Sequence, residues 1–185
     1  MIRPITGADI PAVLAILEIS IGPGWVTGPD LRPGPSRRVV VAETGGAVAG
    51  VGSAGVRSWH DAVPSDPEAR SAVLAFAGAA PRTVVYLEVA AVDPAARGRG
   101  LYTALLRDRI DWARAAGATL LLSMGWTPPD GCHIAPAMTH AGFTELARTG
   151  GLYRRPGIPE DARCLVCGSP CDCDAVLFGR LVAPA

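Results

Sequence analysis

The chain has 185 residues, of which 49% are hydrophobic and 18% are charged. This length suits one domain, residues 1–185, and so apolar a composition excludes a disordered chain and predicts a sizeable core. The 17 arginines and 17 acidic residues cancel, so neither a nucleic acid nor an anionic membrane surface is an expected partner.

The spacing of apolar and turn residues predicts strands and helices along the whole chain. The expected elements, in chain order, are a strand at 1–6, a helix from 10, a loop at 22–36, strands at 38–43 and 47–57, an insertion at 58–81 with a helix at 67–77, a strand at 82–93, a helix at 101–116, a strand at 118–124, a helix at 135–141, and strands at 143–148 and 175–182. This order is typical of an α/β fold with a mixed sheet.

Local signals support several of these boundaries. Thr6 and Asp9 form a capping-box pattern before the first helix, and Gly45-Gly46 predicts a hairpin turn. In the helix at 101–116 we expect one stripe to face the core, namely Leu101, Ala104, Leu105, Asp108 and Trp112, with Ile110 and Ala113 beside it.

The segment between the strand at 82–93 and the helix at 101–116 carries the clearest chemical signal. After Pro94 the chain continues through Arg97-Gly98-Arg99-Gly100-Leu101-Tyr102 into the helix. The amides of a glycine-rich turn and a helix N-terminus together suit a phosphate or pyrophosphate, and arginines add donors. An ordinary strand-to-helix turn with solvated arginines is the alternative.

Residues 89–106, VAAVDPAARGRGLYTALL, resemble motif A of the GNAT superfamily of N-acetyltransferases. That motif consists of a strand, the pattern V-x-P-x-x-R/Q-x-x-G-x-G/A and a helix; Val92, Pro94, Arg97 and Gly100 match it. AGF at 141–143 and LFGRL at 177–181 extend the resemblance to nearly the whole chain. The resemblance implies the GNAT fold, an α/β fold with a mixed, mostly antiparallel central sheet flanked by helices.

The resemblance also implies an acyltransferase that takes an acyl group, usually acetyl, from acyl-coenzyme A. In the family the loop amides hold the pyrophosphate, and the preceding strand aligns the pantetheine arm. Carried over, the expected coenzyme-binding residues are Ala90, Ala91, Val92, Arg97, Gly98, Arg99, Gly100, Leu101 and Tyr102. The strands that hold Glu88 and Leu121 are expected to splay apart and admit the arm.

Three positions depart from the family's pattern. Tyr102 stands where the motif ends in glycine or alanine, and Gly131 stands near a position that is often asparagine. Met138 replaces a tyrosine that in the family often protonates the departing thiolate. The general acid is therefore not identified.

Acylation of an amine needs a base, and Glu88 is the candidate. It lies in the middle of an apolar strand, where partial burial is expected to raise the pKa of its carboxyl group. The alternative is a structural carboxylate paired with an arginine. Cys132 and His133 are secondary candidates, and a nucleophilic Cys132 would imply an acyl-enzyme.

Four of the five cysteines lie in the segment 156–174, between the last two expected strands. A C-x-x-C-G knuckle followed by C-x-C predicts a structural zinc site with four thiolate ligands, which leaves no open position for catalysis. The expected ligands are Cys164, Cys167, Cys171 and Cys173. Cys132 or His133 could replace one of them, and an iron–sulfur cluster or two disulfides are alternatives.

The sequence therefore predicts an N-acyltransferase that moves an acetyl or other acyl group from acyl-coenzyme A directly to a small-molecule amine. The zinc is expected to stiffen a loop on the acceptor side. Alternatives are a coenzyme A-binding module that holds a partner through the zinc knuckle, and transfer with a larger acyl group or a hydroxyl acceptor. A homodimer is left open.

The apolar runs are short, and the first residues show no signal-peptide pattern. We therefore expect a cytoplasmic protein without membrane partners, and a reducing cytoplasm disfavours disulfides.

Overall fold

The computed structural model describes residues 1–63, 66–78, 83–150 and 159–183. The strands are β1 (Ile2–Pro4), β2 (Arg37–Thr44), β3 (Ala47–Arg57), β4 (Val84–Val92), β5 (Leu120–Thr127), β6 (Thr144–Thr149) and β7 (Asp174–Leu181). The helices are α1 (Ile10–Ile21), α2 (Trp59–Ala62), α3 (Pro67–Ala77), α4 (Leu101–Ala115) and α5 (Ala135–His140). Among the described residues the strands form one sheet in the order β1-β2-β3-β4-β5-β7-β6, in which only β4 and β5 pair in parallel.

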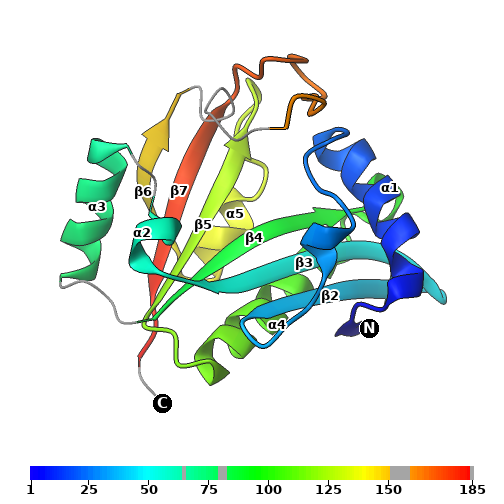
Figure 1. Cartoon of the computed structure of the whole chain (residues 1–185), viewed down its shortest axis with the longest axis horizontal. Helices are drawn as coiled ribbons and strands as arrows, with labels where there is room; N and C mark the ends of the chain where they lie inside the picture. Colours follow the sequence, from blue (N-terminus) through cyan, green and yellow to red (C-terminus); the bar gives the residue numbers. More distant parts are fainter. Residues whose placement is uncertain (64–65, 79–82, 151–158, 184–185) are drawn as a thin grey trace.

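This arrangement confirms the expected α/β fold with a mixed, mostly antiparallel sheet (Figure 1). The hairpin between β2 and β3 turns at Gly45 and Gly46, whose φ angles of 60° and 79° suit glycine. The sequence did not predict α2, because a helix of 4 residues gives no periodicity to detect. The cysteine-rich segment lies between β6 and β7, as expected.

Helices cover both faces of the sheet, and alternating strand residues separate the two packed layers. Val39 and Val41 of β2 pack with α1, whereas Val40 and Ala42 pack with α4. The helices α2 and α3 lie on the face that α1 covers, and α5 lies with α4 on the other (Figure 1).

The stripe predicted for α4 was partly wrong. The buried residues of this helix are Leu105, Leu106, Arg109, Ile110 and Ala113. Asp108 instead lies at the edge of the helix and forms an ion pair with Arg38 at 3.0 Å. Arg109, a charged residue, therefore occupies a core-facing position of α4, where periodicity predicts an apolar residue.

Two irregularities in the middle of the sheet open it beside β4. Gly52 pairs with Ala90 and Ala54 pairs with Leu87, so β4 contains an extra residue, a bulge, between these pairs. The parallel pairing of β4 with β5 ends at Leu87 and Ser123, although both strands continue. The two strands thus diverge as predicted.

The capping box at the first helix is confirmed. The Thr6 amide and hydroxyl both donate to the Asp9 carboxylate at 2.8 Å, and Arg3 donates two further hydrogen bonds to it. Hydrogen bonds from Arg3 hold the pKa of the Asp9 carboxyl well below its usual range. These contacts fix α1 against the edge of the sheet.

No described helix combines the length and the apolar character that crossing a membrane requires.

Candidate active site and metal centre

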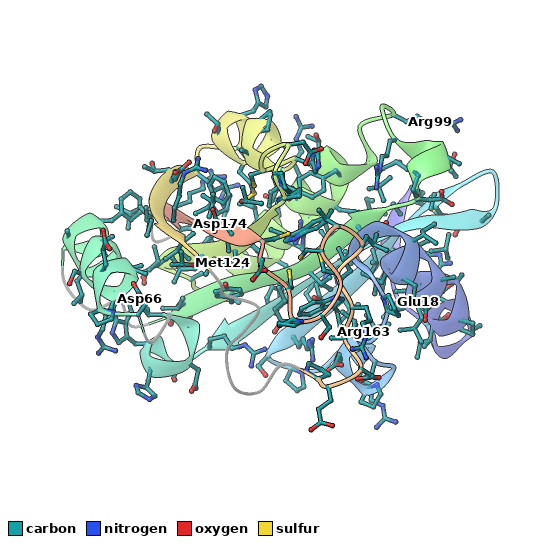
Figure 2. All side chains as sticks on the ribbon, turned by 90° about the horizontal axis from the view of Figure 1, so that it is seen from above. Glu18, Asp66, Arg99, Met124, Arg163 and Asp174 are labelled. Atoms are coloured by element: carbon teal, nitrogen blue, oxygen red, sulfur yellow. The ribbon has the colours of Figure 1, made fainter. Side chains whose placement is uncertain are left out.

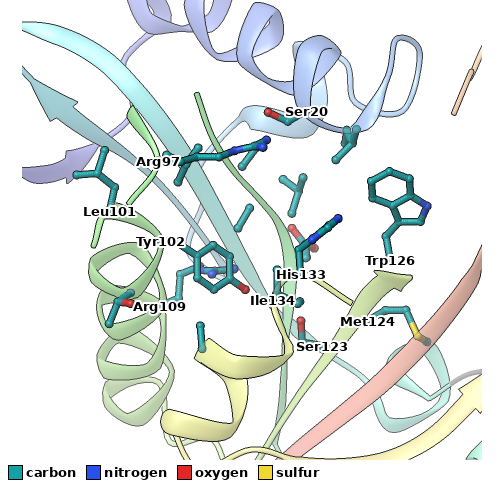
Figure 3. Close-up of a pocket in the computed structure, with 18 of the residues that line it drawn as sticks. Ser20, Arg97, Leu101, Tyr102, Arg109, Ser123, Met124, Trp126, His133 and Ile134 are labelled. Carbon is teal, nitrogen blue, oxygen red and sulfur yellow. The ribbon is translucent and has the colours of Figure 1, made fainter. Parts of the chain in front are cut away.

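The divergence of β4 from β5 opens into a cavity of about 750 Å³. Its walls come from β4, β5, the loop before α4, the start of α5 and the end of α1 (Figure 3). The cysteine-rich segment also lines it. Strand divergence leaves backbone and side chains of β4 accessible from within the sheet, which a regular ladder would hide. The cavity is therefore the place where an extended molecule can enter the sheet.

The glycine-rich loop lies at one end of this cavity. A short 3₁₀ turn at Pro94–Ala96 follows β4, and Gly98 and Gly100 then adopt φ angles of 75° and 74°, which favour glycine. α4, a helix of 15 residues, begins directly after Gly100. The loop and the N-terminus of α4 thus border the cavity, an arrangement typical of pyrophosphate sites.

Most of the coenzyme-binding residues predicted from the sequence line the cavity. These are Ala90, Ala91, Val92, Arg97, Gly98, Gly100, Leu101 and Tyr102. Arg99 is exposed at the periphery of the molecule, outside that lining (Figure 2). Contact of each residue with coenzyme A remains a prediction.

Tyr102 projects from the first turn of α4 into the cavity (Figure 3). Its hydroxyl group lies 3.8 Å from the Met138 sulfur of α5. Burial raises the pKa of the phenol, and the neighbouring Arg109 opposes that rise. Tyr102 thus closes the gap between α4 and α5 with a protonated hydroxyl.

Glu88 also lines the cavity and is held at the bulge of β4 on the face that α1 covers. Its carboxylate forms ion pairs with Arg37 at 2.8 Å and with Arg57, and accepts a hydrogen bond from Ser53. The side chain is 13% exposed, so the expected partial burial is confirmed. The structure shows the arginine pairing considered as an alternative, and a role as base remains a prediction.

His133 and Ile134, just before α5, line the cavity, whereas Cys132 lies outside its lining. The Nε2 atom of His133 lies 3.3 Å from the Asp130 carboxylate, and both side chains are exposed. Sequence reasoning did not single out Arg109 and Ser123, which also line the cavity. The sequence signal that could have revealed Arg109 is its helical spacing, four residues after Leu105 and four before Ala113, which places it on the buried face of α4.

The four cysteines of the C-terminal segment gather into one cluster. The sulfurs of Cys164, Cys167, Cys171 and Cys173 all lie within 4.8 Å of one another. The nearest pairs are separated by 3.4, 3.7 and 3.8 Å. Zinc–sulfur bonds of about 2.3 Å in a tetrahedron place sulfurs about 3.8 Å apart, so this cluster fits a zinc knuckle.

The surroundings of the cluster also suit a thiolate-bound cation. The backbone amide of Val166 donates to the Cys164 sulfur and that of Asp172 to the Cys167 sulfur, at 3.4 and 3.2 Å. Such bonds orient thiolate ligands around a metal. His133 and Cys132, considered as substitute ligands, are not members of the cluster.

The cysteine cluster packs onto the cavity and onto the loop after α1. Cys164 and Cys171 line the cavity, and Trp25 and Trp126 pack against the cluster. The Trp25 indole donates to the Arg163 carbonyl at 2.8 Å. Whatever stiffens the cluster therefore also shapes one wall of the cavity.

Comparisons with known proteins agree with this geometry. The sequence model described as the acetyltransferase (GNAT) family matches residues 20–130, more than half of the chain. A comparison with curated proteins found no match.

Several solved structures share the fold at low sequence identity. The ribosomal-protein-S18-alanine N-acetyltransferase of Escherichia coli has a TM-score of 0.66 and 18% identity, over 100% of this chain and 95% of that one. An agmatine N-acetyltransferase variant has a TM-score of 0.65 and 15% identity, over 98% and 99%. Arabidopsis thaliana NAA60 in complex with acetyl-CoA has a TM-score of 0.68 and 14% identity, over 98% of both chains. With this fold, a strand-divergence cavity and a matching family sequence, the chain belongs to the GNAT acetyltransferase family.

Proposed function

We propose that this protein transfers an acetyl or other acyl group from acyl-coenzyme A directly to the amine of a small molecule. The observation that carries the proposal is the cavity where β4 and β5 diverge, with the loop Arg97–Tyr102 at its end. Coenzyme A brings a thioester, whose carbonyl is the electrophile. The amides of Gly98 and Gly100 with Arg97 suit its pyrophosphate, and the free edge of β4 suits its pantetheine arm.

On the side of β4 that faces α1, two chain segments wall the cavity, and this enclosure favours a small acceptor. The loop after α1 and the cysteine-rich segment both line the cavity, through Trp25, Cys164 and Cys171. Glu88 lies on this side and is the proposed acceptor of the proton that the amine loses. A Glu88→Gln variant that keeps the wild-type rate would contradict this role.

The proposal is tested by release of free thiol from acetyl-coenzyme A in the presence of a panel of small amines, with N-terminal peptides as the competing acceptor class. Turnover that requires a small amine supports the proposal. Turnover with peptides alone would reassign the acceptor to a protein amine; the name of the E. coli neighbour gives an alanine of a ribosomal protein as its acceptor.

Arg97 offers a test of the coenzyme site that does not require a known acceptor. We expect Arg97→Ala to weaken coenzyme A binding about tenfold, because a charge-assisted hydrogen bond to phosphate contributes about 1.5–3 kcal/mol. Titration calorimetry with coenzyme A measures the change. Arg32→Ala is the matched control, since Arg32 is exposed in a loop and does not line the cavity. Equal affinity in both variants would remove Arg97 from the site.

The second candidate function is a coenzyme A-binding module that recruits a partner through its zinc knuckle. Leu165 and Val166, at the tip of the knuckle, are each 52% exposed, which is unusual for adjacent large apolar residues. Coenzyme binding without turnover on any amine or peptide would favour this module.

A further inference from the structure

Arg109 of α4 is a buried cation for which the described residues provide no counter-ion. It is 2% exposed, and no ion pair involving it is found among the described residues. Its Nε donates to the Leu105 carbonyl at 3.1 Å, and its Nη1 lies 3.5 Å from the Ser53 carbonyl. Its Nη2 has no hydrogen-bond partner in the described part of the chain.

The sheet is built to admit this side chain. A Cβ at Gly52 of β3 would lie 3.0 Å from the Arg109 Nε, so a larger residue there would press on the guanidinium group. Arginine stays protonated in proteins, and an unpaired buried charge costs several kcal/mol. A hydrophobic side chain would fill the space without that cost, which indicates that the charge serves a ligand.

The guanidinium group lines the cavity close to the point where the sheet opens. Gly52, beside it, pairs with Ala90, which lies just beyond the last β4–β5 pair at Leu87 and Ser123. Arg109 and Tyr102 project from the same side of α4 into this part of the cavity (Figure 3). The unpartnered Nη2 of Arg109 and the phenol of Tyr102 therefore belong to two side chains that line the same part of the cavity.

The donors still available suit a single-atom anion better than a carboxylate. Arginine binds carboxylates side-on through the parallel N–H groups of Nε and Nη2, and here Nε already donates to the Leu105 carbonyl while Nη1 faces the Ser53 carbonyl. What remains unpartnered is Nη2, with two N–H groups, together with the Tyr102 hydroxyl, whose nearest acceptor is the Met138 sulfur at 3.8 Å. A sulfur anion can accept from both, whereas a carboxylate would lose its fork geometry.

We propose that Arg109, assisted by Tyr102, binds the sulfur of coenzyme A as a thiolate. The proposal rests on the proposed function. When the amine nitrogen bonds to the carbonyl carbon and the C–S bond breaks, the bonding electron pair leaves with sulfur. The amine's proton passes to a base or to water, and the thiolate next to Arg109 takes a proton from solvent when coenzyme A is released. Arg109 thereby stabilises the leaving group.

The test compares coenzyme A with desulfo-coenzyme A, which lacks the sulfur, by calorimetric titration from pH 6 to pH 9 under reducing conditions. A free aliphatic thiol has a pKa of about 8.5. If the site favours the thiolate, the ratio of the two dissociation constants is near one at pH 6. As pH rises, the dissociation constant of coenzyme A falls relative to that of desulfo-coenzyme A. The ratio levels off above the pKa of the free thiol. We expect at least a tenfold preference for coenzyme A at pH 8.5, as for a charge-assisted hydrogen bond.

Other titrating groups in this region should affect both ligands alike. They are Tyr102 and Asp108 of α4, Glu88 of β4, and Cys132 and His133 before α5. Because desulfo-coenzyme A experiences the same groups, the ratio isolates the sulfur.

Arg109→Met should abolish the preference at every pH and leave the affinity for desulfo-coenzyme A within twofold of wild type. Arg109→Lys should keep a reduced preference. A thermal melt no lower than that of wild type shows that Arg109→Met is folded. A wild-type ratio that stays near one, or a ratio unchanged in Arg109→Met, would overturn the thiolate site alone. Failure of wild type to bind either ligand would overturn the proposed function as well.

Discussion

The purified protein should contain one zinc ion per chain, and Cys171→Ser should lose most of it. Cys171 is 3% exposed and its sulfur lies 3.4 Å from that of Cys167, so a serine there removes a ligand from a closed four-thiolate set. Elemental analysis of protein prepared without chelators gives the metal content. Iron in place of zinc, or less than about half an ion per chain, would contradict the zinc assignment.

The metal should also contribute to stability. The folded cluster binds zinc far more tightly than the unfolded chain, so bound metal adds to the free energy of unfolding. We expect Cys171→Ser, or wild type treated with a strong chelator, to lose about 10 °C in melting temperature.

Cys132→Ser is the matched control. Cys132 is a free cysteine near α5 and does not belong to the cluster, so this variant should keep its full zinc content and lose little stability. Equal metal loss in both variants would mean that Cys132 is a ligand.

Gly22→Ala should be among the most damaging single-methyl additions to this protein. Gly22 ends α1 with a φ of 111°, and a Cβ there would lie 1.8 Å from the Arg163 carbonyl oxygen. The methyl group would therefore separate the loop after α1 from the cysteine-rich segment. It would break the hydrogen bonds from Trp25 to Arg163 and from Arg163 to Pro23.

The control for backbone strain is Gly78→Ala. Gly78 has a φ of 77° but nothing lies within 4 Å of a Cβ there, so its substitution introduces strain without a clash. We expect about 1–2 kcal/mol of destabilisation for Gly78→Ala and at least about 2 kcal/mol more for Gly22→Ala. Chemical denaturation measures both. If the two variants unfold at the same denaturant concentration, the packing of these two segments does not contribute to stability.

Loss of zinc from Gly22→Ala would add a second result. It would show that the loop after α1 supports the metal centre, as the packing of Trp25 against the cluster implies. Retention of zinc would confine the effect to the contact itself.

The chain order of the elements was predictable because each depends on nearby residues. The capping box at Thr6 and Asp9 and the glycine turn at Gly45-Gly46 are local hydrogen-bonding and φ requirements. Side-chain periodicity located β3 and α3 with the bounds that the structure shows. The four-cysteine cluster was predictable for a related reason, since its ligands come from one short segment.

The environments of individual charged residues were not predictable in the same way. The local sequence around Glu88 left open whether an arginine pairs with it, and Arg37 and Arg57 reach it from β2 and β3. The stripe predicted for α4 did not include Arg109, whose burial depends on its packing against β3, including the Ser53 carbonyl. Both outcomes depend on residues more than thirty positions away in the chain.

The composition and local sequence by themselves determined an apolar α/β chain of balanced charge, a phosphate-type loop before α4 and a four-cysteine knuckle. Only the tertiary structure decided that the loop, the knuckle and the bulge of β4 surround one cavity. It also decided that an unpaired arginine lies in the wall of that cavity. Local propensities act through neighbours along the chain, whereas ion pairing and burial depend on which strands and helices meet in space.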